Sequence, residues 1–114
     1  MSQSPSGFAA MPLVLMQHGG LTSLTGKTGL AMLRHRPGPI VAVIDPDHAG
    51  QSLELVTGIP RRVPVVRNLA EALPHGPAAA VVGLAPSGGG LPDAIRTDVL
   101  AALDAGLSLA SGLH

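Results

Sequence analysis

The chain of 114 residues contains no cysteine, tryptophan or tyrosine, and Phe8 is its single aromatic residue. The absence of cysteine excludes disulfides and thiolate metal sites. With so little aromatic area to bury, the core must consist of Val, Leu, Ile, Ala and Met side chains. The sequence therefore predicts one small domain with an aliphatic core of modest stability.

An excess of charge is also missing, because seven Lys and Arg residues balance seven Asp and Glu residues. Broad nucleic-acid or membrane-surface binding needs a basic patch, so we expect neither kind of partner. No apolar run approaches the roughly 20 residues of a membrane span. The first ten residues lack the basic start and apolar centre of a signal peptide, so we expect a cytoplasmic protein. No two of the five histidines are four residues apart, and we expect no metal site.

The 15 glycines and 11 prolines fall between apolar runs, where they mark turns. This pattern predicts a flexible N-terminus over residues 1–11 and one domain over residues 12–114. Within the domain we expect strands at 13–16, 40–44, 63–66, 79–84 and 107–111. Helices are expected at 26–35, 52–56, 68–73 and 92–105.

Apolar strands that alternate with helices are typical of a parallel sheet covered on both faces. The fold class is therefore α/β, a Rossmann-like three-layer sandwich with a five-stranded parallel sheet in the order 3-2-1-4-5. In such a sheet a ligand crevice opens where the strand order reverses, between strands one and four. Two glycine-rich loops, 18–29 and 85–90, follow these two strands and should meet at that crevice.

The first loop leads from a strand into a helix, which is an arrangement that favours anion binding. Small residues let the backbone approach a ligand, and the first turn of the helix offers unpaired N–H groups. We predict a phosphate-bearing ligand here. The candidate binding residues are Gly20, Thr25, Gly26, Lys27, Thr28 and Gly29 in the first loop, and Pro86, Ser87, Gly88 and Gly89 in the second.

Neither common nucleotide motif is complete. The P-loop pattern requires glycine where the chain has Leu21, and the dinucleotide fingerprint requires glycine where it has Leu24. Asp45 ends the second strand, where an acidic side chain can hold a ribose. The alternative interpretation is that Asp45 and Asp47 only form a strand-ending turn around Pro46.

Other polar residues have two interpretations or a purely structural one. His18 and His114 follow strands and either line the crevice or are solvated loop residues; we favour the second. We expect a solvated turn at Arg61 and Arg62. The sequence also predicts a capping box from Asn68 to Glu71.

The last helix should bury one stripe of side chains, consisting of Ile95, Val99, Leu100 and Leu103. Gly106 should end this helix as its C-cap.

Four stretches together carry a family resemblance: Lys27-Thr28 with 33–37, 43–45 with Ala49-Gly50, 83–86 with Gly88-Gly89, and Ala105-Gly106 with 111–114. With them the chain resembles the N-terminal Rossmann-like domain of the D-glutamate N-acetyltransferase-like family, long described only as a domain of unknown function. The resemblance implies a two-domain protein in which this domain precedes a P-loop domain. It also implies acetyl transfer from acetyl-CoA to an amino acid such as D-glutamate.

Thr25-Gly26-Lys27-Thr28-Gly29 is in addition similar to the phosphate turn of the CoA-binding domain of succinyl-CoA ligases, although Ser23 replaces one of its glycines. That similarity implies a CoA pyrophosphate near Gly26 and Gly29, with Thr25 and Lys27 as side-chain donors.

Our leading hypothesis is thus the nucleotide- or CoA-binding domain of an amino-acid N-acetyltransferase, with acetyl-CoA or another phosphate-bearing nucleotide as cofactor and no assigned catalytic base. The alternatives are a non-catalytic domain that packs on the P-loop domain or on a second copy, and an NAD-binding module.

Overall fold

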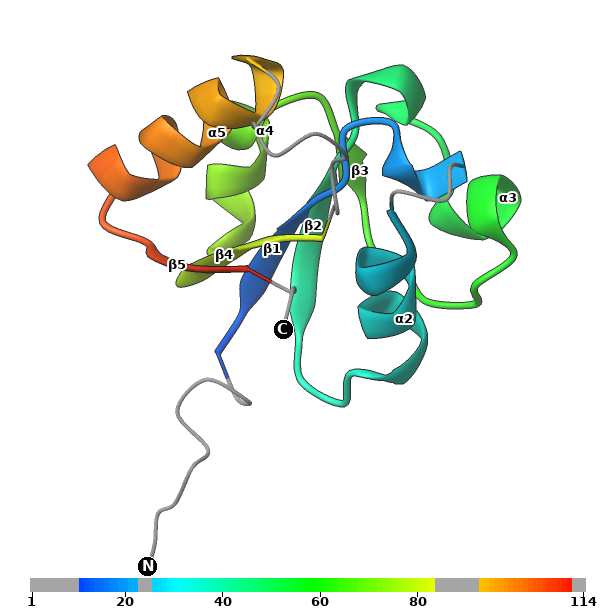
Figure 1. Cartoon of the computed structure of the whole chain (residues 1–114). Coiled ribbons are helices and arrows are strands. Elements are labelled where there is room, and N and C mark those ends of the chain that lie inside the picture. The colour runs from blue at the N-terminus through cyan, green and yellow to red at the C-terminus, as the bar shows by residue number, and fades with distance from the viewer. Residues whose placement is uncertain (1–10, 23–25, 84–92, 112–114) are drawn as a thin grey trace, which may run out of the picture.

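The computed structural model describes residues 11–22, 26–83 and 93–111. Figure 1 shows a central sheet with helices on both sides. The strands are β1 (Leu13–Met16), β2 (Ile40–Ile44), β3 (Val65–Val66), β4 (Ala79–Val82) and β5 (Ser108–Ser111). The α-helices are α2 (Lys27–His35), α3 (Leu53–Thr57), α4 (Leu69–Ala72) and α5 (Asp93–Asp104). Short 3-10 turns are η1 (Gly20–Thr22), η3 (Pro46–His48) and η4 (Leu73–His75).

The strand order is β3-β2-β1-β4-β5, and every pairing between neighbours is parallel. The predicted Rossmann-like sheet is therefore confirmed, with β1 at its centre. Fully buried apolar strands explain this arrangement, because a sheet without a polar face must be covered on both sides. The third strand is shorter than expected and spans two residues, Val65 and Val66.

Alternate residues of β1 enter two separate cores. Leu13 and Leu15 face α2 and α3, where they pack with Leu33 and Leu53. Val14 and Met16 face α4 and α5, where Leu69 and Ile95 are among their partners. We call these faces the α2 side and the α5 side (Figure 1). Two aliphatic cores thus position the sheet between its helices.

Single residues in the sequence correctly predicted where two of the helices begin or end. The Asn68 side chain accepts a hydrogen bond from the Glu71 N–H at 3.0 Å, as a capping residue should. Glu71 differs from the expected box, because its carboxylate accepts from the Arg67 N–H instead of the Asn68 N–H. Gly106 has the left-handed φ of 85° typical of a glycine that ends a helix, and it lies two residues after Asp104, the last residue of α5.

The predicted buried stripe of α5 was wrong in part. Ile95 is buried and Val99 is half-buried, but Leu100 and Leu103 are 59% and 51% exposed. Asp98 and Ala102 are buried in their place. The helix is rotated relative to the prediction because Asp98 has buried partners, which its sequence neighbours do not reveal.

None of the helices in the described part of the chain has the length and apolar character needed to cross a membrane. The same residues contain no cluster of three or more His, Asp or Glu side chains that could hold a metal ion.

Candidate functional site

The candidate site lies at the carboxyl ends of β1, β2 and β4, which we call the carboxyl edge. The strand order reverses at β1, which has β2 on one side and β4 on the other. Crevices at such a reversal are where open α/β sheets bind ligands. Gln17 and His18 follow β1 here, Asp45 follows β2 and Gly83 follows β4.

On the α2 side, the backbone of α2 meets the backbone of the residue directly after β4. The Gly29 N–H donates a hydrogen bond to the Gly83 carbonyl at 3.0 Å. The buried Gln17 side chain lies against both glycines, and a Cβ at either position would overlap its amide oxygen. Its Nε2 also donates to the Gly26 carbonyl at 3.2 Å. Gly29 and Gly83 are therefore required for close packing around Gln17.

The start of α2 is equally tight. Gly26 is the N-cap residue, and a Cβ there would overlap the backbone carbonyl of Gly20. Within the described part of the chain, no side chain caps this helix end. Lys27 is exposed and Thr28 is half-buried in the first turn. The Gly29 N–H is already used by Gly83, so an anion bound here would rely on the remaining first-turn donors and on Lys27.

Asp45 holds the turn after β2. One oxygen of its buried carboxylate, Oδ1, accepts from the Gly19 N–H at 2.9 Å and the Asp47 N–H at 3.0 Å. The other, Oδ2, is buried and has no hydrogen-bond partner among the described residues. The Asp47 bond is the one expected of a strand-ending turn. A ribose contact by Asp45 stays a prediction.

On the α5 side, His18 is not the solvated loop residue that we favoured. Its side chain is 6% exposed, and Nε2 lies 2.7 Å from Oδ2 of Asp98 in α5. Oδ1 of Asp98 accepts from the Leu69 N–H at the start of α4 at 2.9 Å. Asp98 thus joins the end of β1 to two helices.

Of the predicted binding residues, the structure brings Gly20, Gly26 and Gly29 together near the end of β1. Thr25, Pro86, Ser87, Gly88 and Gly89 lie outside the described residues, as do residues 1–10 and His114. The prediction of binding residues omitted Gln17, Gly83 and Asp98. A signal was present for Gln17, a polar residue directly after four fully buried strand residues.

Comparison with known proteins decides the family. The model of a domain of unknown function described as the DUF1611_N Rossmann-like domain matches residues 46–114, which is more than half of the chain. The chain belongs to the DUF1611_N family. This DUF1611_N domain is also similar to the crystal structure of a DUF1611 family protein from Anabaena variabilis ATCC 29413, with 49% sequence identity and a TM-score of 0.86.

That similarity covers 91% of the DUF1611_N domain and 30% of the Anabaena chain. The domain therefore spans about 30% of the length of the protein that it matches. No curated protein matches the chain.

Away from the carboxyl edge, Arg61 of the DUF1611_N domain has a structural role. Its guanidinium donates to the carbonyls of Leu33, Arg36 and Gly38 at 3.2, 2.7 and 2.6 Å. The expected solvated turn was therefore wrong for Arg61, which closes the C-terminal end of α2. Burial, and secondarily the charge of Arg61, lower the pKa of Arg36 from its usual value.

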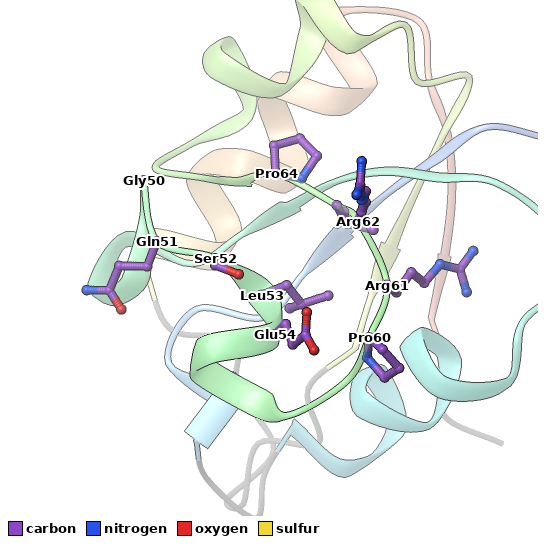
Figure 2. A pocket seen from close by; sticks show the side chains of 10 residues that line it. Gly50, Gln51, Ser52, Leu53, Glu54, Pro60, Arg61, Arg62 and Pro64 are labelled. Carbon is purple, nitrogen blue, oxygen red and sulfur yellow. The ribbon is translucent and has the colours of Figure 1, made fainter.

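Arg62 instead lies on one wall of a surface groove of about 510 Å³ between α3 and the segment before β3 (Figure 2). Gly50 to Glu54 form one wall of the groove, and Pro60 to Pro64 form the other. None of the predicted binding residues lines it, and we assign it no ligand.

Proposed function

We propose that this domain is the nucleotide- or CoA-binding domain of an amino-acid N-acetyltransferase, with acetyl-CoA as acyl donor and D-glutamate as acyl acceptor. The observation that carries the proposal is the contact of α2 with β4 at the point where the strand order reverses. Glycines at Gly26, Gly29 and Gly83 let backbone segments and the Gln17 side chain approach closely there, and glycines between a strand and a helix are typical of phosphate sites in Rossmann-like folds.

In this proposal the pyrophosphate lies at the start of α2, where the helix dipole favours negative charge. Lys27 adds a positive charge in the first turn, and its exposed side chain is available to a ligand. Gly20 and Thr28 are the further contacts among the described residues, and Thr25 and Pro86 to Gly89, which lie outside them, stay predicted contacts. Asp45 approaches the ribose through its second carboxylate oxygen.

The proposal includes a second domain. The domain spans 30% of the Anabaena relative, which leaves room for the C-terminal P-loop domain that the resemblance implies. In this proposal the DUF1611_N domain binds the acyl donor, and both domains contribute residues to the active site.

Differential scanning calorimetry with acetyl-CoA, NAD and ATP in separate samples tests the proposal. A ligand at 100 times its dissociation constant stabilises the fold by about 2.7 kcal/mol, which raises Tm by several degrees in a domain of this size. We expect this shift with acetyl-CoA. A shift with NAD alone would replace the proposal with the NAD-binding alternative, and no shift with any ligand would contradict cofactor binding.

A pair of variants on one helix locates the phosphate site. Lys27→Ala removes the charge at the start of α2, and Arg34→Ala removes an exposed charge from its last turn. We expect Lys27→Ala to weaken acetyl-CoA binding about tenfold and to reduce its salt dependence. Arg34→Ala should leave affinity within twofold. Equal effects of the two variants would remove Lys27 from the site.

One observation favours a second candidate, a non-catalytic packing domain. Leu100 and Leu103 on α5 are more than half exposed, and exposed leucines in one helix suit an interface with the next domain or a second copy. Sedimentation velocity across a hundredfold range of protein concentration tests self-association. A shift from monomer to dimer that Leu103→Ser abolishes would support this candidate.

A further inference from the structure

His18 is the most unusual side chain at the carboxyl edge. It is more than nine-tenths buried, and its Nε2 lies 2.7 Å from Asp98. Its φ of 31° is positive, which is uncommon for a residue other than glycine. The backbone N–H of His18 donates to the Ile44 carbonyl at 3.0 Å, so neighbouring structure holds this conformation.

The contacts of Asp98 fix which imidazole nitrogen carries the proton. One carboxylate oxygen accepts from the Leu69 N–H, and the other faces His18 Nε2. A carboxylate only accepts hydrogen bonds, so Nε2 must be the donor. Neutral His18 therefore keeps its lone pair on Nδ1.

This Nδ1 is buried and has no hydrogen-bond partner among the described residues. Buried polar atoms in folded proteins nearly always have partners, so an exception calls for an explanation. A nitrogen lone pair whose tautomer is set by a carboxylate is the arrangement of a general base. It suits a ligand that brings an N–H or O–H donor, and not a phosphate.

We propose that His18 is a catalytic residue that accepts a proton from the amino group of the acyl acceptor, and that Asp98 is its positioning residue. This inference rests on the proposed function and adds to it a base and an amine subsite on the α5 side. The phosphate contacts belong to the α2 side, so the donor and the acceptor approach the end of β1 from opposite faces of the sheet.

The proton balance of the step is complete. Nδ1 of His18 takes one proton from the acceptor's ammonium group and frees the nitrogen lone pair. The amine nitrogen of the acceptor then attacks the thioester carbonyl carbon, so a C–N bond forms and the C–S bond breaks. The second proton that the nitrogen loses neutralises the departing thiolate. The products are the N-acetyl amino acid and the thiol of CoA, and His18 releases its proton to water.

Nuclear magnetic resonance of the ¹⁵N-histidine-labelled chain tests the base directly. The free protein should show His18 protonated at Nε2 and not at Nδ1. D-glutamate, added with CoA so that no acetyl group can react, should move the Nδ1 resonance towards that of a protonated nitrogen. An Nδ1–H proton in the free protein would overturn the proposal.

Two variants separate a chemical role from a structural one. His18→Asn suits the positive φ, because asparagine tolerates the left-handed region. Asp98→Asn keeps an oxygen for the Leu69 N–H but turns a donor towards Nε2, which forces the proton of His18 onto Nδ1. By isothermal titration calorimetry, we expect each variant to weaken D-glutamate binding about tenfold and to leave CoA affinity within twofold. Melting temperatures verify that both variants fold.

The outcomes of these experiments distinguish the role of His18 from the proposed cofactor binding on which it rests. If CoA binds and both variants keep the wild-type affinity for D-glutamate, the proposed role of His18 is wrong and the cofactor proposal stands. A response of His18 to D-glutamate without any binding of CoA would overturn the cofactor proposal and support the amine subsite. No response to either ligand would overturn both.

Discussion

The two side chains that leave the end of β1 enter opposite faces of the sheet and meet different surroundings. Gln17 enters the α2 side, where glycines bring backbone against backbone and a single added methyl group would overlap its neighbours. His18 enters the α5 side, where a carboxylate holds the ring and the other ring nitrogen has no partner among the described residues.

This difference indicates which side of the sheet suits anion binding and which suits proton transfer. The glycines on the α2 side let other groups come close to the backbone, which suits the recognition of an anion by backbone N–H groups. On the α5 side, one ring nitrogen of His18 has no hydrogen-bond partner among the described residues, which suits proton transfer.

Gly26→Ala should have the largest effect, because the new methyl group would overlap the backbone of Gly20. Backbone atoms cannot move aside as a side chain can, so we expect a loss of about 3 kcal/mol in the free energy of unfolding. Urea denaturation followed by far-UV circular dichroism measures it. A loss below about 0.5 kcal/mol would show that the α2 side is less tightly packed than we infer.

Arg61→Ala should reduce stability by about 2 kcal/mol, because three carbonyls near the end of α2 lose a charged donor. The matched control is Arg62→Ala, in which an exposed side chain is removed from the next position. We expect the control to stay within about 0.5 kcal/mol of the wild type. Equal losses in the same denaturation experiment would contradict the closing role of Arg61.

Gly29→Ala should cost about 1.5 kcal/mol, which is the overlap with Gln17 less the gain in helix propensity. The same substitution in an open helix position would be stabilising, so the sign alone is informative. A double-mutant cycle with Gln17→Ala should show a coupling of about 1 kcal/mol. Additive losses would mean that Gln17 is not the obstructing group.

Leu103→Ser should change stability least, by less than about 0.5 kcal/mol, because this residue of α5 is 51% exposed. Ala102→Ser is the matched control, since it places the same hydroxyl at a buried neighbour and should cost about 1 kcal/mol. A larger loss at Leu103 than at Ala102 would indicate that the originally predicted stripe, and not the observed one, is buried.

Much of the fold could be predicted because its signals are local. Apolar runs without polar interruption identified the strands, and their alternation with helices led to the strand order. Asn68 and Gly106 marked helix ends through preferences of a few residues. Helix orientation was less accessible, since Leu100 and Leu103 are as apolar as the residues that are buried.

The candidate site was predictable only in part, because its decisive contacts join distant segments. Asp98 lies within an amphipathic helix, and only its partners His18 and Leu69 explain its burial. Arg61 likewise has the sequence surroundings of a turn residue, and only its three carbonyl partners explain its role. The glycines of the first loop were found from composition, but the reason for Gly29 depends on Gln17 and Gly83.

The hydrogen bond between Gly29 and Gly83 also constrains how the domain acquires its shape. Gly83 directly follows β4, so the Gly29–Gly83 hydrogen bond requires β4 to be docked beside β1, and we expect the start of α2 to reach its final position only then. Closure of such a long chain segment slows folding, because its entropy is lost before the contact forms. On a ribosome, we therefore expect the start of α2 to reach its final position only after β4 has emerged, so that an ordered carboxyl edge would indicate that the first four strands have assembled.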